Sequence, residues 1–157
     1  MKELQLTSNM KECQLDELTA EEQHLIGLAV EATRHSYVPY SHFHVGAAVR
    51  LANGMEISGC NQENAAFPAG ICAERSAIFA AGAQYPDQPI ELLAITAAND
   101  EGVLQQEPVS PCGTCRQVII EIETRYKHPV RILLHGSRCT YVVDGISQLM
   151  PLSFTEF

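Results

Sequence analysis

The 157-residue sequence has no tryptophan, and aromatic residues make up only 6% of it. Hydrophobic residues still account for 46%, enough to support a folded core rather than a disordered chain. That core must therefore be built mainly from alanine, valine, isoleucine and leucine. The length suits one domain, and we expect a single domain over residues 19–157 that follows a poorly defined N-terminal extension at residues 1–18.

Long apolar runs and positive charge are also scarce. Runs such as Ala77–Ala83 and Val45–Val49 fall far short of the roughly 18 residues that span a bilayer. The N-terminus has no apolar stretch typical of a signal peptide. The formal net charge of -9 disfavours binding to a phosphate backbone or to an anionic membrane. We therefore expect a cytoplasmic protein with a small, neutral partner, and neither nucleic acid nor a membrane as partner.

Local patterns predict helices that alternate with strands. Thr19 before an acidic and then apolar series predicts a capped helix that ends near Tyr37, because Pro39 disfavours continuation. Asn53-Gly54 between two β-like runs predicts a hairpin. The remaining expected elements are a loop at 61–70, a helix at 71–83, a strand at 91–98, a helix at 116–126, strands at 130–136 and 140–145, and a short helix at 146–150. This order predicts an α/β fold with a partly parallel sheet and helices on its faces.

The six cysteines indicate metal binding or catalysis if the compartment is reducing. Cys112 and Cys115 form a C-x-x-C pair at an expected loop–helix junction. Two thiolates at this spacing suit zinc, and a helix N-terminus favours the thiolate form. Taken alone, the pair fits a redox-active dithiol or two buried cysteines equally well.

A second cluster at residues 72–75 favours the metal. Cys72 supplies a third thiolate, and Glu74 stands two residues after it. Catalytic zinc takes three protein ligands and keeps a fourth position for water, whose proton a nearby carboxylate can accept. Taken alone, Glu74 could equally serve the helix dipole.

The run Cys72-Ala73-Glu74 together with Pro111-Cys112-x-x-Cys115 resembles the signature of the zinc-dependent nucleoside deaminases. The resemblance is greatest to the small, homotetrameric cytidine deaminase family, from about Thr19 to Phe154. The segments that carry it are 41–48, 61–64, 70–77, 110–117 and 148–154. It implies a three-layer cytidine deaminase-like fold with a mixed central sheet of about five strands and helices on both faces.

The resemblance also implies the chemistry. Cys72, Cys112 and Cys115 would hold one Zn²⁺ per subunit, and Glu74 would shuttle protons between zinc-activated water and the cytosine ring. Arg75 would offset the charge of the thiolates; its alternative is an exposed helix arginine. The reaction would be hydrolytic deamination of cytidine or deoxycytidine, as in pyrimidine salvage.

The same resemblance implies the substrate contacts. Asn61 and Glu63 would hold the ribose, and Phe43 would flank the base or sugar. The Ala73 N–H would face the pyrimidine O2, and the Ser110 carbonyl would accept from the leaving amino group. Phe154 would enter the site of a neighbouring subunit in a homotetramer.

Two other interpretations compete. One is a deaminase of another aminopyrimidine such as blasticidin S; the Asn61-Gln62-Glu63-Asn64 loop favours a plain nucleoside instead. The other is a zinc-binding module without turnover. Structural zinc sites are usually closed by a fourth ligand, which no Cys or His supplies at motif spacing, and such a module would leave Glu74 without a purpose.

Overall fold

A six-stranded mixed sheet forms the centre of the computed structural model, which describes residues 1–155. Its strands are β1 (Lys11–Cys13), β2 (His44–Leu51), β3 (Glu56–Cys60), β4 (Ile90–Ala98), β5 (Arg131–His135) and β6 (Thr140–Asp144). They lie in the order β1-β6-β5-β4-β2-β3. The pair β4–β5 is parallel, and the other neighbours pair antiparallel. The prediction of a mixed sheet in an α/β fold is confirmed.

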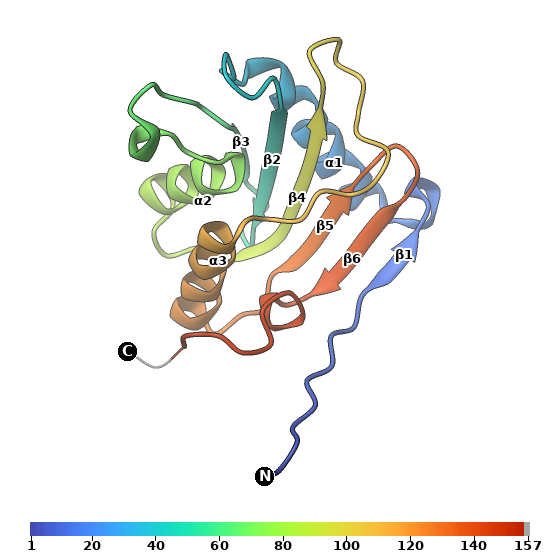
Figure 1. The fold of residues 1–157 in the computed structure, drawn as a ribbon, viewed down its shortest axis with the longest axis vertical. Coiled ribbons are helices and arrows are strands. Elements are labelled where there is room, and N and C mark those ends of the chain that lie inside the picture. The colour runs from blue at the N-terminus through green and yellow to red at the C-terminus, as the bar shows by residue number, and fades with distance from the viewer. Residues whose placement is uncertain (156–157) are drawn as a thin grey trace.

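Three helices complete the layers: α1 (Ala20–Ala32), α2 (Ala73–Gln84) and α3 (Gly113–Tyr126). Side chains alternate between the two faces of a strand, and the core divides accordingly. Ala48 and Ala94 pack with α1 on one face, whereas Val49 and Ile95 pack with α2 and α3 on the other. Figure 1 shows α1 behind the sheet and the other two helices in front of it. The expected three-layer arrangement is therefore present.

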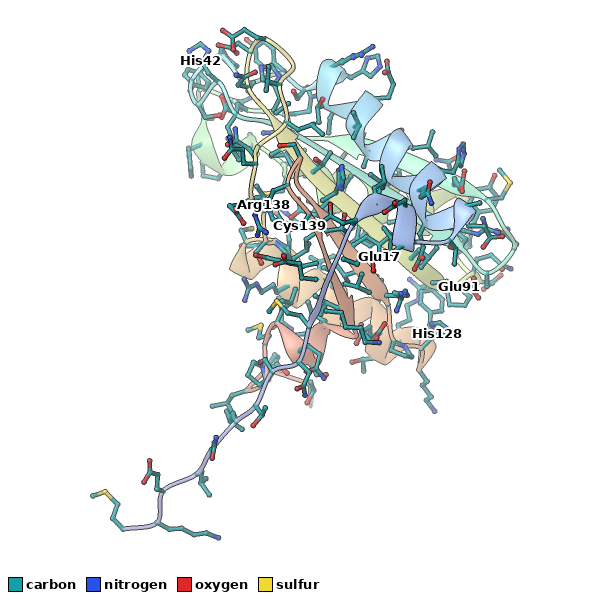
Figure 2. All side chains as sticks on the ribbon, turned by 90° about the vertical axis from the view of Figure 1, so that its right-hand side faces the viewer. Glu17, His42, Glu91, His128, Arg138 and Cys139 are labelled. Atoms are coloured by element: carbon teal, nitrogen blue, oxygen red, sulfur yellow. The ribbon has the colours of Figure 1, made fainter. Side chains whose placement is uncertain are left out.

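The strand count of about five is wrong by one. The sixth strand, β1, lies in the segment expected to be poorly defined, and it pairs with the edge of β6 so that Cys13 stands opposite Thr140. β1 has only three residues, two of them charged, which is too short for the alternating apolar pattern of a strand to be recognised. The strand forms because it pairs with β6, more than 120 positions away in the sequence. The segment before β1 runs away from the body of the molecule (Figure 2).

The first helix is shorter than predicted. It ends at Ala32, and a 3-10 turn (Thr33–His35) follows. Two hydroxyl groups complete this turn: Thr33 Oγ1 donates to the Val30 carbonyl and Ser36 Oγ donates to the Thr33 carbonyl. Such local hydrogen bonds compete with continued helix. The hairpin at Asn53-Gly54 is confirmed between β2 and β3, and Gly54 has a φ of +81° that favours glycine.

Two glycines allow the helices to approach the sheet closely. A Cβ on Gly46 of β2 would lie 2.0 Å from the Ala29 carbonyl oxygen of α1. A Cβ on Gly59 of β3 would lie 2.5 Å from the Ala77 nitrogen of α2. The second contact sets the distance between β3 and the start of α2, which carries the candidate site. No helix within residues 1–155 combines the length and apolar character needed to cross a membrane.

Candidate metal and active site

Three cysteine sulfurs meet where α2 and α3 begin. Cys72 is the N-cap of α2, Cys112 is the N-cap of α3, and Cys115 lies in the first turn of α3. Their Sγ atoms all lie within 4.8 Å of one another, and those of Cys72 and Cys112 are 3.8 Å apart. Cys115 is buried, Cys72 is half-buried and Cys112 is exposed. The three residues expected as ligands thus form one cluster that is open on one side.

The cluster favours negative charge at Cys72. A hydrogen bond from the Cys115 thiol, aided by Arg75, lowers the pKa of Cys72 to about 5 against the opposing effect of burial. The same contact with Cys72, together with burial, raises the pKa of Cys115. Arg75 Nη2 donates to Cys72 Sγ at 3.6 Å, while the buried Arg75 Nε has no hydrogen-bond partner within residues 1–155. A cation beside a thiolate stabilises the charged form.

These residues fit a zinc ion. Thiolates are soft donors that suit zinc, three of them leave a fourth position open, and a cation stands against the sulfurs to offset their charge. All six cysteines are free thiols. A redox disulfide between Cys112 and Cys115 would leave the convergence of Cys72 unexplained.

Glu74 lies close to this cluster. Its side chain belongs to the first turn of α2 and is only 4% exposed. Burial raises the pKa of its carboxyl, and the negative charge of Cys72 adds to the rise. Glu74 and Cys115 lie close enough to influence each other's pKa. A buried carboxyl with a raised pKa is suited to accept and return a proton.

A cavity of about 500 Å³ opens beside the sulfurs. Cys72, Cys112 and Arg75 form one wall, and the segment after β3 forms the other. The cavity therefore joins two regions that are separate in the sequence, and its size suits a small organic molecule.

Asn61 and Glu63 line this cavity, and both also organise its rim. Asn61 Oδ1 accepts from the Val45 N–H and its Nδ2 donates to the Phe43 carbonyl, each at 2.9 Å. Glu63 Oε2 accepts from the backbone N–H of Tyr40 at 2.9 Å. Hydrogen bonds, first among them one from Ser41, hold the pKa of the Glu63 carboxyl below its usual value. The two side chains thus anchor the segment that leads into β2.

Four other predicted contacts do not line the cavity: Phe43, Ala73, Ser110 and Phe154. Phe43 is half-buried at the entry to β2, Ala73 is buried, and Ser110 is exposed before α3. Phe154 is 64% exposed, and its carbonyl accepts from Gln117 Nε2 at 3.2 Å. The single chain described here therefore gathers the metal ligands, Asn61 and Glu63, but not these four.

Sequence reasoning missed Tyr40, Ile71 and Thr114, which also line the cavity. Thr114 stands inside the C-x-x-C pair, so its position beside the ligands could have been expected. Tyr40 lies in a turn directly before the segment 41–48 that carries the resemblance, and no local signal distinguishes it. Phe67 also lines the cavity, where it is 92% exposed.

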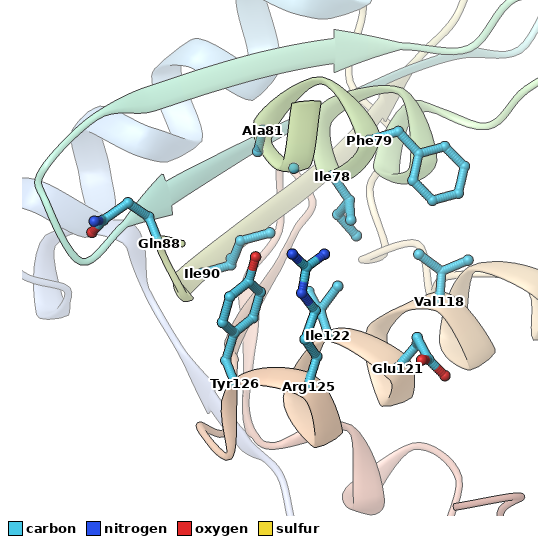
Figure 3. A pocket seen from close by; sticks show the side chains of 11 residues that line it. Ile78, Phe79, Ala81, Gln88, Ile90, Val118, Glu121, Ile122, Arg125 and Tyr126 are labelled. Atoms are coloured by element: carbon cyan, nitrogen blue, oxygen red, sulfur yellow. The ribbon is translucent and has the colours of Figure 1, made fainter. Parts of the chain in front are cut away.

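A second hollow of about 350 Å³ lies between α2 and α3. Figure 3 shows its mainly apolar walls, with Ile78 and Phe79 on α2 facing Val118 and Ile122 on α3. None of the residues predicted for the site lines it. The candidate chemistry therefore lies at the beginnings of these helices and not between them.

Known proteins resemble the chain along most of its length. A family model for the cytidine and deoxycytidylate deaminase zinc-binding region matches residues 19–128. A cytidine deaminase from Halalkalibacterium halodurans is 37% identical over 133 residues, which cover 85% of this chain and 93% of that protein. A crystal structure of cytidine deaminase from Burkholderia pseudomallei superposes with a TM-score of 0.71 at 34% identity, covering 87% of this chain and 100% of the other. A blasticidin-S deaminase from Bacillus cereus is more distant, at 29% identity over 140 residues, or 88% of this chain and 96% of that protein.

The cavity beside three converging cysteines, the three-layer fold and these similarities agree with one another. The chain belongs to the cytidine deaminase family and is a hydrolytic deaminase.

Proposed function

We propose that the enzyme converts cytidine and deoxycytidine to the corresponding uracil nucleosides and ammonia, as a step of pyrimidine salvage. The observation that carries this proposal is the convergence of three cysteine sulfurs beside a cavity that fits a small molecule. The buried Glu74 lies close enough to Cys72 and Cys115 to interact with them electrostatically. Residues 19–157 would form the catalytic domain of a cytoplasmic homotetramer.

Cys72, Cys112 and Cys115 would hold one Zn²⁺ per subunit. When bound, the ion supplies a water whose pKa is lowered to about 7, and hence a nucleophile at neutral pH. Three thiolates and Zn²⁺ carry a net charge of one negative unit, which weakens a Lewis acid. Arg75, which donates to Cys72 Sγ, offsets that charge at the sulfur itself.

Glu74 moves the protons. Its carboxylate accepts a proton as the water oxygen bonds to C4 of the cytosine, and it delivers that proton to ring N3. The same carboxyl then carries the second proton of that oxygen to the amino nitrogen, the C4–N bond breaks as the C4 carbonyl forms, and ammonia leaves. Because the Glu74 side chain is almost fully buried, it would transfer these protons within the site, shielded from bulk water.

The nucleoside would be held by the rim of the cavity. Glu63 Oε2 accepts from the backbone N–H groups of Tyr40 and Ser41, and the same carboxylate would accept from the 3′-hydroxyl of the sugar. Asn61 Nδ2 donates one of its two hydrogens to the Phe43 carbonyl, and the second would donate to the sugar. A carboxylate at this place also disfavours a 3′-phosphate, because two anions repel each other.

The remaining contacts follow the family resemblance. Phe43 would flank the base or sugar, the Ala73 N–H would face O2, and the Ser110 carbonyl would accept from the leaving amino group. Phe154 would reach the site of a neighbouring subunit, which is consistent with its exposure in the single chain. On this proposal the homotetramer is part of the active site.

The test follows the loss of cytosine absorbance with purified, zinc-loaded protein and cytidine, deoxycytidine or blasticidin S. We expect turnover of the two nucleosides. Glu74→Gln should lose at least about a hundredfold in kcat, the scale of positioned acid–base catalysis, while it keeps its zinc. Glu31→Gln, on the exposed surface of α1, is the matched control and should retain full activity.

Other results would redirect the assignment. Turnover of blasticidin S alone would identify a deaminase of another aminopyrimidine. Bound zinc without turnover of any of the three compounds would indicate a zinc-binding module.

A further inference from the structure

Arg116 directly follows the candidate ligand Cys115, yet it does not line the cavity. Its guanidinium donates to two backbone carbonyl oxygens, those of Pro111 and Leu149. The first of these residues lies just before α3, and the second lies near the C-terminus, just after the 3-10 turn η4 (Ile146–Gln148). One half-buried side chain therefore joins two segments that are distant in the sequence.

The contact with Pro111 helps to fix the backbone next to Cys112. Arg116 Nε donates to the Pro111 carbonyl at 2.9 Å, and the Arg116 backbone N–H donates to the Cys112 carbonyl, also at 2.9 Å. A single residue thus holds the carbonyl groups of the ligand and of the residue before it. Because Pro111 is buried, its carbonyl would lose its partner if the guanidinium were removed.

The contact with Leu149 holds the C-terminal segment, residues 149–154, against α3. The next residue on α3, Gln117, donates through Nε2 to the Phe154 carbonyl at 3.2 Å. Two consecutive side chains of α3 therefore hold the segment 149–154 at both of its ends. That segment carries the aromatic side chain proposed to enter a neighbouring site.

We infer that Arg116 is a positioning residue that fixes Cys112 for metal binding and anchors the C-terminal segment through the same guanidinium. This inference rests on the proposed function, in which Cys112 is a zinc ligand. Arg75 acts differently, because it donates to a ligand sulfur, whereas Arg116 acts through the backbone. Outer-shell hydrogen bonds of this kind typically change metal affinity by about 10–100-fold when they are removed.

The experiment compares Arg116→Met and Arg116→Lys with Arg125→Met. Arg125 is the matched control, because it lies on the same helix and donates to another proline carbonyl, that of Pro86, at 2.9 Å. It lies at the far end of α3 from the cysteines, beside Tyr126 (Figure 3). Zinc affinity is measured by competition with a chromophoric chelator, and exposure of the C-terminal segment is measured by limited proteolysis with chymotrypsin, both on the full-length protein.

We expect Arg116→Met to bind zinc at least about tenfold more weakly and to be cleaved faster near Phe154. Arg116→Lys keeps the charge but reaches one carbonyl at a time, so it should recover only part of both properties. Arg125→Met should match the wild type. Wild-type zinc affinity and protection in Arg116→Met would overturn the inference, as would an equal loss in Arg125→Met.

If Arg116→Met does not fold, the lysine variant decides: wild-type values for it overturn the inference, and the partial losses support it. Failure of the proposed function has a separate signature, which is a zinc-loaded wild type that turns over no cytosine nucleoside. Neither the zinc affinities nor the cleavage rates depend on that result.

Discussion

At the scale of single residues, close backbone contacts determine where the candidate site residues lie. Gly59 on β3 is an example, because a Cβ there would lie 2.5 Å from the Ala77 nitrogen and 2.8 Å from the Ala73 carbonyl oxygen. Both atoms belong to the backbone of α2, so no side chain can move aside. The same turn of α2 carries Glu74 and follows Cys72. The absence of one methyl group thus sets how closely the turn that carries Glu74 packs against β3.

Gly59→Ala should therefore destabilise the protein by about 1–3 kcal/mol, as overpacking of a tight core does. Because α2 must shift, kcat should also fall. Gly82→Ala, within α2, is the control. No atom lies within 4 Å of its added Cβ, and we expect a gain of about 0.5–1 kcal/mol because alanine is the better helix former. Urea denaturation measures both free energies of unfolding. Equal stability of the Gly59→Ala variant and the wild type would contradict the steric explanation.

At the scale of elements, one carboxylate begins α1 and ties it to the sheet. Glu22 Oε2 accepts from the Thr19 N–H at 2.9 Å, and the Glu22 N–H donates to Thr19 Oγ1 at 3.2 Å. Glu22 Oε1 accepts from Arg131 Nε of β5 at 2.6 Å. Burial alone would raise the pKa of Glu22, but the hydrogen bonds from Arg131 and Thr19 outweigh it and hold this pKa below the ordinary value of 4.5.

A lowered carboxyl pKa means that the folded state binds fewer protons than the unfolded state. The stabilisation that the Glu22 carboxylate provides is therefore present above about pH 4.5. It is lost as the pH falls through the lower pKa that Glu22 has in the folded state. Glu22→Gln should lower the free energy of unfolding at pH 7 by about 1–2 kcal/mol, a modest loss because Arg131 is partly exposed to solvent. The variant should also show a weaker dependence of stability on pH in the acid range. Glu21→Gln is the control, since Glu21 is 63% exposed and pairs with Arg50. Urea denaturation at a series of pH values measures the free energy of unfolding of each protein. The same pH dependence in the acid range for the Glu22→Gln variant and the wild type would refute the linkage.

At the scale of the whole molecule, the N-terminal segment closes one edge of the sheet. Glu12 of β1 pairs with Arg138 at 3.0 Å, and Arg138 also pairs with Glu107 in the loop that leads to the cysteine pair. The Asn9 N–H donates to Gln148 Oε1 at 2.8 Å. The N-terminal segment thus contacts Arg138, which also holds the loop before α3, and it contacts the 3-10 turn η4.

Deletion of residues 1–14 should lower the melting temperature by about 4 °C or more, the shift that a loss of 1–2 kcal/mol produces at this size. It also exposes β6 as an unpaired edge, which favours association. Deletion of residues 1–8 keeps β1 and Asn9 and should leave the melting temperature unchanged. Thermal melts with light scattering test both forms. Identical melting of the longer deletion and the wild type would mean that β1 adds nothing to stability.

The candidate site residues could be named from the sequence because each motif is local and because the two motifs together resemble a known signature. Cys72 and Glu74 stand at the start of α2, and Cys112 and Cys115 stand at the start of α3. The convergence of the two motifs, 40 positions apart, is implied by the resemblance and not by local spacing. The hairpin at Asn53-Gly54 is also local, since two residues determine its turn. The strands β4, β5 and β6 were predictable from apolar composition alone.

Features that depend on distant partners could not be predicted in this way. The short strand β1 exists through its pairing with β6, and Tyr40 reaches the cavity because Glu63 holds its backbone. Asn61 was predicted as a sugar contact, but its amide also anchors the entry to β2. The sequence by itself determined the reactive groups, their local spacing and the α/β fold. Only the tertiary structure decided which backbone groups hold them in place, because hydrogen bonds and close contacts between remote segments leave no periodic trace in the chain.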